Sequence, residues 1–464
     1  MNARDLTRLG VPIGEAQRRA VDFVATFILR GGDKARLAEE VSAVLKSPGA
    51  YLKDPLRSDF AKSILSAPPP PRSDPVHYRQ WGEELDPESL AQMERACLLP
   101  VSVAGALMPD AHVGYGLPIG GVLATDNAVI PYAVGVDIAC RMKMTVLDLP
   151  VRDLDRKSEK LARAIETETR FGVGATFRER RNHAVLEADW SVSPITKANR
   201  DKAWAQLGTS GSGNHFVEFG KFTVLETELD LPPGEYLALL SHSGSRGTGA
   251  QVCDYYSKMA FAKHPDLPGE MKRLAWLSLD SGEGQEYWQA MELMGQYAAA
   301  NHSLIHASIA SHLGLEVRLD IENHHNFAWK ERHVIQGVQR EVVVHRKGAT
   351  PAGKGVFGII PGSMASPGYV VRGKGNDDSL HSASHGAGRC MSRKAALQAF
   401  TWEKANRVLK ERGVKLLSAG LDEVPMVYKD IHQVMAAQTD LVEVLGRFDP
   451  KIVKMAPSGE RPED

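Results

Sequence analysis

The stretch from residue 381 to residue 393 combines residue types that can bind and transfer a phosphate group. Its sequence is His381-Ser-Ala-Ser-His385-Gly-Ala-Gly-Arg389-Cys-Met-Ser-Arg393. Gly386 and Gly388 let backbone N–H groups approach an anion closely, and the two arginines can pair with phosphate. His385 is then the reactive group. The competing interpretation is a glycine-rich turn with a capping histidine, leading into a helix from about Ser392.

A second set of residues carries the side chains that hold divalent metal ions. A carboxylate, a thiolate and three imidazoles each lie at or near the expected end of a strand: Asp137, Cys140, His215, His242 and His325. This mixture suits a borderline or soft divalent metal, and one thiolate can bridge two ions. Taken singly, each histidine is better explained as a hydrogen-bonded structural residue. Five such positions in similar settings favour a shared metal site.

Three loops rich in serine and glycine could each surround a phosphate. They cover residues 208–213, 241–247 and 361–363. None matches the GxxxxGK[ST] phosphate loop or the GxGxxG dinucleotide motif in its βαβ setting. Together with His385 and Lys454, they suggest a nucleotide site of another design, in which a histidine could attack the α-phosphorus.

The elements that must position these residues follow an N-terminal appendage. Helical periodicity predicts two helices over residues 13–30 and 33–47, with Asp33 as the N-cap of the second. The run Ala67-Pro-Pro-Pro-Pro-Arg72 favours an extended linker. We therefore expect a helical extension with a proline-rich linker over residues 1–72 and the main domain over residues 73–464.

The main domain mixes expected helices with short strands and many glycine-containing loops. Helices are expected over residues 85–99, 156–170, 283–313 and 392–412, and the third of these could be broken once. Strands are expected from Val129 to Val136, from Tyr236 to Leu240 and from Arg340 to His345. The first two strands end just before the candidate ligands Asp137 and His242.

Composition limits the class of protein. The chain has 464 residues, of which 43% are hydrophobic and 24% charged, which fits one large elaborated domain or two to three smaller units. A net charge of −1 excludes a globally basic nucleic-acid binder. The local groups Arg178, Arg180, Arg181 and Arg346, Lys347 could still contact a nucleic acid, but they are interpreted as solvated faces.

The cysteines and the N-terminus indicate the compartment. Cys97, Cys140, Cys253 and Cys390 are scattered and form no CxxC pair, which argues against a disulfide framework and a zinc knuckle. The first residues, MNARDLTRLG, lack a signal-peptide core, and no run reaches the ~18 apolar residues of a membrane span. We expect a cytoplasmic protein that has no membrane partner.

Successive motifs of the chain resemble those of the RtcB family of RNA-splicing ligases, in the family's order. They are MPDAHVGYGLPIGG, GVDIAC, GSGNHFVE, HSGSRG, HHN, HRKGATPAGKG, IPGSM, HGAGRCMSR and VYKDI. The resemblance spans roughly residues 85–454 and leaves the N-terminal extension outside it. It implies a single large α/β (α+β) domain with a dinuclear manganese centre. Such an enzyme uses GTP to join an RNA 2′,3′-cyclic phosphate or 3′-phosphate end to a 5′-hydroxyl end.

The resemblance also implies a role for each candidate residue. Asp137, Cys140 and His215 would hold one Mn²⁺ ion, and Cys140, His242 and His325 would hold the other. His385 would be guanylylated by GTP and would then pass GMP to the RNA 3′-phosphate. In the last step the 5′-hydroxyl of the other RNA end would displace GMP. The positions that match nucleotide contacts are Asn214, Phe216, Glu218, Asn326, Ser363, Gly388, Tyr428 and Lys454. An archease-type activator is a further expected partner.

Three positions depart from the family pattern. Arg141 stands where a glycine usually follows the ligand cysteine, Gly368 replaces a serine, and Lys454-Met455 with nine further residues replaces a terminal Lys-Gly. Arg141 could point away to pair with a carboxylate or reach toward the RNA phosphate.

Two alternative functions stay open. One is a dinuclear metal phosphoesterase without a covalent step, and the other is an RNA-end sensor that recruits partners through the N-terminal extension. The sequence around His385 favours the ligase, because a hydrolase would not need that histidine.

Overall fold

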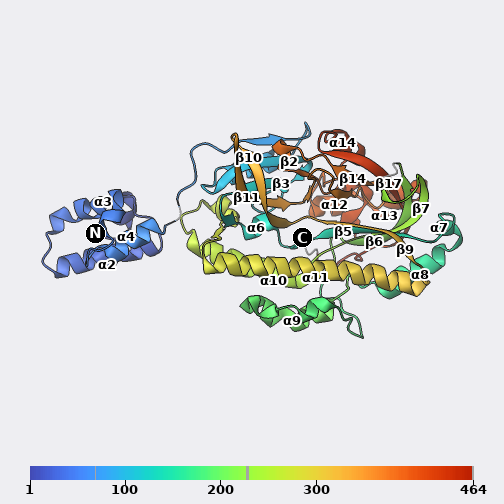
Figure 1. Cartoon of the computed structure of the whole chain (residues 1–464), viewed down its shortest axis with the longest axis horizontal. Coiled ribbons are helices and arrows are strands. Elements are labelled where there is room, and N and C mark those ends of the chain that lie inside the picture. Colours follow the sequence, from blue (N-terminus) through green and yellow to red (C-terminus); the bar gives the residue numbers. More distant parts are fainter. Residues whose placement is uncertain (68, 226–228, 462–464) are drawn as a thin grey trace.

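Two β-sheets form the body of the protein in this computed structural model, which describes residues 1–67, 69–225 and 229–461 (Figure 1). The first sheet has five strands in the order β1-β2-β3-β11-β10. The second has eight strands, ordered β13-β14-β17-β6-β7-β5-β9 with β16 beside β17. Helices alternate with these strands along the chain, so the expected α/β fold is confirmed.

The strand bounds show how the two sheets interleave in sequence. The first sheet contains β1 (Tyr78–Gln80), β2 (Ser102–His112), β3 (Ile119–Thr125), β10 (Phe327–Ile335) and β11 (Val338–Lys347). The second contains β5 (Arg141–Leu147), β6 (Phe216–Val224), β7 (Gly234–Ser243), β9 (Val317–His324), β13 (Phe357–Ile360), β14 (Gly368–Gly373), β16 (Lys415–Ser418) and β17 (Val442–Met455). Two small ladders pair β4 (Ala128–Val129) with β8 (Leu277–Ser278) and β12 (Ala349–Pro351) with β15 (Ser382–Ser384).

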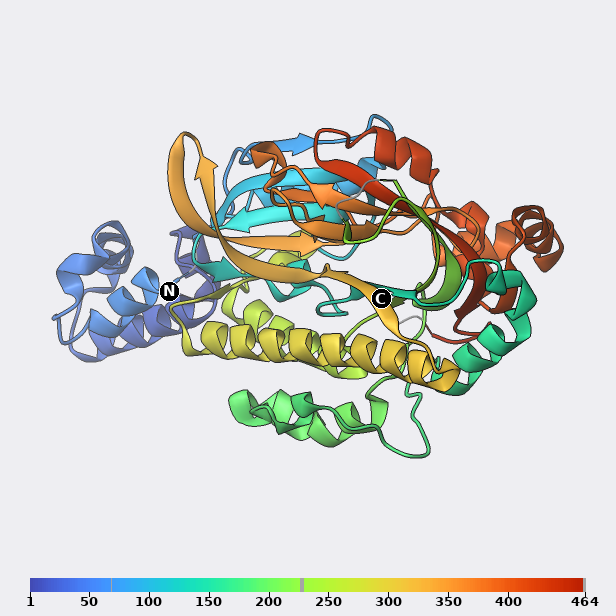
Figure 2. The same cartoon turned by 45° about the vertical axis from the view of Figure 1, so that its right-hand side comes forward.

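One long helix, α11 (Gly282–Leu313), runs beneath both sheets in the two views of the chain (Figures 1 and 2). Its 32 residues are continuous, without the break that the sequence left open. Ser281 caps its start by accepting a hydrogen bond from the Gly284 N–H at 3.1 Å, and Gly314 ends it at a φ of 67°. None of the described helices is long and apolar enough to cross a lipid bilayer.

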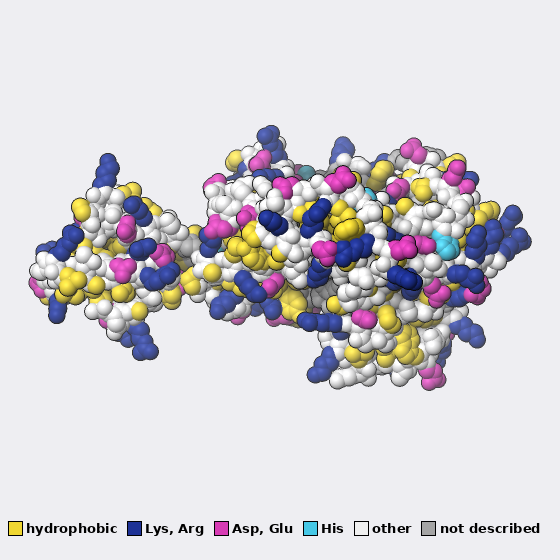
Figure 3. All heavy atoms as spheres, turned by 90° about the horizontal axis from the view of Figure 1, so that it is seen from below, with side chains coloured by type: hydrophobic (Ala, Val, Ile, Leu, Met, Phe, Trp, Pro, Cys, Tyr) yellow, Lys and Arg dark blue, Asp and Glu magenta, His cyan; other side chains and the backbone are white. Residues whose placement is uncertain are grey.

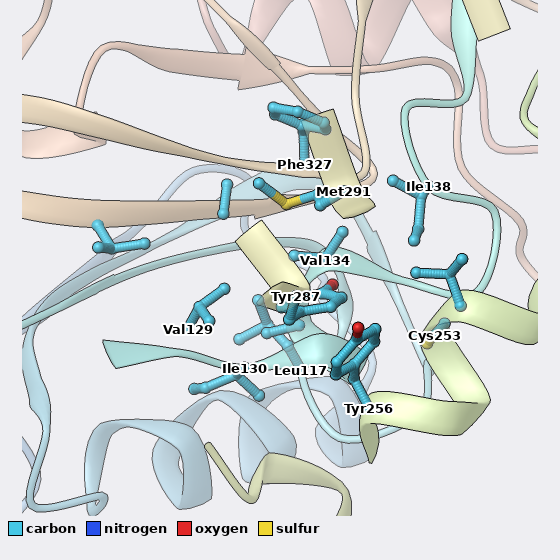
Figure 4. Packing of buried hydrophobic residues seen from close by; sticks show 14 of the residues in the cluster. Leu117, Val129, Ile130, Val134, Ile138, Cys253, Tyr256, Tyr287, Met291 and Phe327 are labelled. Carbon is cyan, nitrogen blue, oxygen red and sulfur yellow. The ribbon is translucent and has the colours of Figure 1, made fainter. Parts of the chain in front are cut away.

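A buried hydrophobic cluster anchors the segment that carries Asp137 and Cys140. Val134 and Ile138, on either side of this segment's turn, lie in one cluster with Tyr287 and Met291 of α11 and with Phe327 (Figure 4). Burying each of these large side chains stabilises the folded state by roughly 1.5–3 kcal/mol. The loop over residues 135–140 is therefore fixed by apolar packing at both of its ends.

The main-domain helices expected over 85–99, 156–170 and 283–313 are close to their expected positions, whereas α9 (Pro194–Gln206) and α10 (Arg246–Lys263) were not predicted and two further expectations need correction. The other main-domain helices of eight or more residues are α5 (Pro87–Cys97), α8 (Ser158–Glu168) and α13 (Trp402–Arg412). The single helix expected over 392–412 is instead two, because α12 (Arg393–Ala399) stops and Thr401 caps the start of α13. The strand expected from Val129 to Val136 is wrong: β4 ends at Val129 and α6 (Pro131–Val134) follows, since a proline fits the first turn of a helix and cannot continue a ladder.

The N-terminal residues form four helices around a hydrophobic cluster of their own. These are α1 (Ala3–Arg8), α2 (Glu15–Leu29), α3 (Leu37–Lys46) and α4 (Ser58–Leu65), and they bury Leu6, Phe23, Val41 and Phe60. The sequence predicted only two of them, because six and eight residues are too few to show a helical period. Asp33 caps as expected, but the turn that it starts is a short 3₁₀ segment before α3.

The N-terminal helices touch the body over a small area. The Ile13 N–H donates to the Asp266 carboxylate at 2.8 Å, and Gly14 lies against Pro265. Seen from below, a narrow neck separates these helices from the body, and on this face acidic and basic side chains are interspersed (Figure 3). Arg72, past the prolines, is part of the body: its N–H donates to the Leu98 carbonyl at 2.7 Å, and its guanidinium donates to the Pro100 carbonyl at 3.0 Å.

The contacts of Arg72 set the expected outcome of N-terminal truncation. A chain that starts at Pro70 should fold and show the main thermal unfolding transition of the full chain. A chain that starts at Ser73 should unfold at a lower temperature, because each lost hydrogen bond of Arg72 contributes about 0.5–1.5 kcal/mol. Arg72→Ala in the full-length chain is the control; it keeps the backbone bond to Leu98 and should reproduce only the part of the loss that comes from the guanidinium. Insoluble protein from the Pro70 start would show that the N-terminal helices belong to the folding core.

Candidate metal centre and active site

Four neighbouring strands of the second sheet bring the candidate metal ligands together. β7 pairs with β6 and β5, and β5 pairs with β9, all antiparallel. In this register His242 lies opposite both Met142 and Phe216, and Arg141 lies opposite His324. Cys140 and His215 directly precede β5 and β6, and His325 directly follows β9. The side chains from four distant segments therefore meet at one end of these strands.

The five side chains form two overlapping groups with Cys140 in both. Asp137, Cys140 and His215 form one group, and Cys140, His242 and His325 form the other, with the candidate ligand atoms of each group within 4.8 Å of one another. The Cys140 Sγ lies 3.4 Å from His215 Nε2 and 3.1 Å from His242 Nε2. Each group could hold one divalent ion, and the shared sulfur could bridge the two.

Backbone and side-chain contacts orient these ligands. His215 Nδ1 lies 2.9 Å from the Ser210 carbonyl, and His242 Nδ1 lies 3.1 Å from the Asn214 carbonyl, so each ring turns its Nε2 toward Cys140. The Asp137 carboxylate accepts from the Ser245 N–H at 2.9 Å. Residue 244, just before that serine, must be glycine, because a Cβ on Gly244 would collide with the Asp137 carboxylate.

Burial favours the protonation states that bind metal. All five side chains are buried. Burial lowers the pKa of His242 to about 3 and that of His325 well below its ordinary value, so both imidazoles are neutral near pH 7. Burial alone would raise the pKa of Asp137, but the hydrogen bond and charge of His215 hold it below its ordinary value. The cluster thus offers the neutral imidazoles of His242 and His325 and the ionised carboxylate of Asp137, which fit a metal ion.

His385 lies beside this cluster and is held by a buried carboxylate. Its ring centroid is 4.9 Å from that of His325. Its Nδ1 lies 2.7 Å from Asp110 Oδ2, which also accepts from the backbone N–H groups of His385 and Gly386 at 3.2 and 3.3 Å. Burial would raise the pKa of Asp110, but the hydrogen bond from His385 and the nearby charges hold it below the ordinary value. An ionised Asp110 fixes the proton on Nδ1 and leaves the lone pair on Nε2.

Asp110 is the functional residue that sequence reasoning missed. It lies inside the eleven-residue strand β2, which was not predicted from the sequence. A charged residue within the otherwise apolar run Ala106–Ala111 was the available signal, because such a residue is buried only when it has a partner. Gly388 packs directly on the Asp110 backbone at a φ of 75°, where a Cβ would collide with the carbonyl.

A cavity of about 1780 Å³ contains both the cluster and His385. It exceeds the roughly 300–1,000 Å³ of a typical small-molecule site. Seven of the eight residues expected at a nucleotide line it: Asn214, Phe216, Glu218, Asn326, Ser363, Gly388 and Tyr428. The eighth, Lys454, is not among its lining residues, although its neighbours Val453 and Met455 are. The Lys454 ammonium lies 5.7 Å from the centre of the Phe171 ring.

Several cations differ from their expected settings. Arg389 and Arg393 line the cavity, but their guanidinium groups contact Glu423 and Asp422, at 3.2 and 2.9 Å respectively. Arg346 and Lys347 are buried, so their interpretation as a solvated face is wrong. Arg346 pairs with Glu331, and burial lowers the pKa of Lys347 to about 7.

Arg141 takes the first of its two expected orientations. Its guanidinium lies 3.3 Å from the Glu322 carboxylate on the neighbouring strand β9, and Arg141 is not among the residues that line the cavity. Strand alternation explains this direction, because consecutive side chains point to opposite faces and Cys140 already points to the cluster.

The sequence of the chain is similar to those of known RNA ligases. Residues 92–455 match the family model for "tRNA-splicing ligase RtcB". The chain is 34% identical to the RNA-splicing ligase RtcB of Escherichia coli K12, covering 73% of this chain and 87% of that protein. It is 32% identical to the tRNA-splicing ligase RtcB of Methanococcus maripaludis (78% and 89%) and 28% identical to the RNA-splicing ligase RtcB homolog 1 of Entamoeba dispar (79% and 82%).

The shared position of Cys140 predicts what its removal does. Cys140→Ala should bind two fewer equivalents of Mn²⁺ than the parent, because one sulfur belongs to both ligand groups. Cys253→Ala should bind as the parent does, since Cys253 is buried beside Pro131 and outside both groups. Equilibrium dialysis with elemental analysis measures the bound metal. Equal metal content in the two variants would rule out a bridging thiolate.

The ion pair of Arg141 predicts an effect on stability and none on metal binding. Arg141→Gly should lower the thermal unfolding temperature, because a buried side chain and its ion pair are lost, at a cost of about 1–3 kcal/mol. Its Mn²⁺ content should equal that of the parent. Glu322→Gln removes the charge of the more exposed partner and should lower the unfolding temperature by less than Arg141→Gly does. Unchanged stability with reduced metal content would place Arg141 in the metal site instead.

Proposed function

The chain belongs to the RtcB family of tRNA-splicing ligases, and we therefore propose that it is a GTP-dependent RNA ligase. In this proposal it joins RNA 2′,3′-cyclic phosphate or 3′-phosphate ends to 5′-hydroxyl ends, with Mn²⁺ as its metal. The observation that carries the proposal is the position of His385, whose Nδ1 is held by buried Asp110 while its ring lies against His325 of the ligand cluster. A phosphoesterase could use the same pair of residues as a general base, so a covalent adduct on His385 is the result that separates the two functions.

In the first step His385 acts as the nucleophile. Its Nε2 attacks the α-phosphorus of GTP, a P–N bond forms, and pyrophosphate leaves with the electrons of the broken P–O bond. Asp110 keeps Nδ1 protonated and stabilises the positive charge that develops on the ring. Without this carboxylate, the proton could move to Nε2 and remove the nucleophilic lone pair.

The next two steps transfer GMP and join the RNA ends. An oxygen of the RNA 3′-phosphate attacks the phosphorus of the histidine adduct, which frees His385 and leaves the RNA end capped with GMP. The 5′-hydroxyl then attacks the RNA phosphorus, loses its proton, and releases GMP as the 3′,5′-phosphodiester forms. A cyclic phosphate end would first be opened by water. At about 1780 Å³ the cavity is larger than a typical small-molecule site, which supports a reaction that brings a nucleotide and an RNA end together.

The candidate ligands and the cavity residues take complementary parts. Asp137, Cys140, His215, His242 and His325 would hold the ions, and two bound cations would supply charge stabilisation to the phosphate oxygens. Asn214, Phe216, Glu218, Asn326, Ser363, Gly388 and Tyr428 would contact the nucleotide. Lys454 stays a predicted contact that would require the nucleotide to reach beyond the lining residues.

Covalent labelling tests the proposal. Purified protein incubated with Mn²⁺ and GTP labelled at the α-phosphate should carry label that acid removes and base does not, as expected for a phosphoramidate. His385→Ala should lose all label, while His432→Ala, which changes an exposed histidine outside the cavity lining, should keep it. Label on the His385→Ala protein would contradict the assignment. Release of RNA terminal phosphate by an unlabelled parent would support the phosphoesterase instead.

Asp110→Asn tests the positioning of His385. The rate of labelling should fall by about 100-fold or more, because an amide does not fix the reactive tautomer, while the Mn²⁺ content should stay at the parent level.

The pH dependence of stability gives a second measurement. The folded-state pKa of Asp110 is lowered, so its stabilising effect is present above its ordinary pKa of 3.8 and is lost as the pH falls through the folded-state value. The difference in free energy of unfolding between the parent and Asp110→Asn should therefore become smaller below about pH 4. A constant difference would contradict this role.

A further inference from the structure

A third group of potential ligands lies outside the cavity, where the first sheet meets the segment that leads to His385. Glu331 and His333 stand two residues apart on β10, so strand alternation puts both side chains on one face. His381 approaches them from the loop before β15. The candidate ligand atoms of the three residues lie within 4.8 Å of one another.

His333 is the buried member of this group. Its side chain is 1% exposed, and its Nε2 lies 2.8 Å from Glu331 Oε2. Its ring centroid is 4.5 Å from that of His381. Its Nδ1 is buried and has no hydrogen-bond partner among the described residues. Within the described part of the chain, the polar contact of this ring is the one from Nε2 to Glu331, and Nε2 is the atom that would bind an ion.

His381 has the arrangement typical of a metal-binding histidine. Its Nε2 lies 3.0 Å from the Asp377 carboxylate. With the proton on Nε2 donated to that carboxylate, Nδ1 carries the lone pair that can bind a metal ion. A carboxylate on one ring nitrogen orients the imidazole and strengthens the other nitrogen as a ligand. The side chains of His381 and Glu331 are 32% and 24% exposed, so an ion and a water molecule can reach the group from solvent.

Glu331 can take part although Arg346 also contacts it. The Arg346 guanidinium donates to both carboxylate oxygens, at 2.7 and 2.9 Å. Each oxygen keeps a second lone pair, and that of Oε2 faces His333. The pKa of Glu331 is lowered to about 2, because the hydrogen bond from His333 and the charge of Arg346 outweigh burial, so the group is an anion at neutral pH. The nearby guanidinium should make this site weaker than one that contains a thiolate.

We propose that Glu331, His333 and His381 form a third divalent-metal site, separate from the Cys140 cluster and suited to zinc. Two imidazoles, one carboxylate and a water molecule make a tetrahedral zinc shell. The ion replaces the proton between Glu331 and His333. This inference does not depend on the proposed ligase activity.

The ion joins the edge strand β10 to the chain that carries the nucleophile. Leu380 and His381 both have positive φ, 52° and 53°, which is costly for residues other than glycine. Four residues after His381 the chain reaches His385. A metal bond to His381 holds this strained turn in place and ties the start of the His385 segment to the first sheet.

Counting bound zinc in the full-length protein tests the site. Protein stripped with a chelator is dialysed against Zn²⁺ alone and analysed for metal. His381→Asn should bind one equivalent fewer than the parent, and asparagine is chosen because it tolerates positive φ. His432→Asn, at an exposed histidine, is the matched control and should bind as the parent does. Zn²⁺ should also raise the unfolding temperature of Cys140→Ala by on the order of a few °C, and that of Cys140→Ala/His381→Asn less.

Cobalt distinguishes the third site from the thiolate cluster. Thiolate-to-cobalt charge-transfer absorption should be the same in the parent and in His381→Asn, because Cys140 is untouched. Cys140→Ala should lose that absorption and still bind the ion that His381 holds. Equal zinc content in parent and His381→Asn would overturn the proposal, as would an equal loss in His432→Asn. Loss of the thiolate absorption in His381→Asn would also overturn it, by showing that the residue acts on the fold.

Discussion

The hydrogen-bonded register of β6, β7, β5 and β9 is the constraint on which the rest of the site depends. His242 sits on the central strand of this group, and Cys140, His215 and His325 sit next to strand ends on either side of it. A slip of one residue in any of these pairings would turn the affected side chain to the opposite face. The apolar cluster under residues 135–140 and the carbonyl contacts of the imidazoles then fix the remaining freedom. Ligand geometry is thus a consequence of sheet pairing rather than of local loop shape.

The site also requires that the two sheets meet at His385. Asp110 belongs to the first sheet and His325 follows the edge strand of the second, and His385 contacts both. Arg346 makes a different connection, since it pairs with Glu331 on the neighbouring strand β10 of the same sheet and donates to the Leu380 carbonyl before β15. Buried charges are costly unless they are matched, so the Asp110–His385 contact fixes the two sheets relative to each other, and Arg346 fixes the segment before β15 against the first sheet.

Sequence reasoning identified residues that carry their own chemical signal and missed those defined by their partners. The five candidate ligands and His385 were found because cysteine, histidine and aspartate beside glycines are informative by type, and all six line one cavity. Asp110 was missed, and Arg346 and Lys347 were misinterpreted, because none of their partners is a sequence neighbour. The partners are His385 for Asp110, Glu331 for Arg346 and the Tyr115 carbonyl for Lys347. Arg389 and Arg393 were expected to face phosphate because Asp422 and Glu423 are about 30 residues away and gave no local sign of pairing. The strand expected over 129–136 failed at Pro131, a local feature that was readable.

The distance along the chain between Asp110 and His385, 275 residues, also determines when the site can exist during synthesis. A ribosome that adds about 5–20 residues per second needs on the order of 10–60 s to make that interval. β2 and β3 can pair early, but until the late segment emerges the Asp110 carboxylate has no imidazole to satisfy it. The nascent protein therefore passes through a long period in which β2 can already be paired while Asp110 still lacks its partner. The contact that joins the two parts of the site can form only after most of the chain has been made.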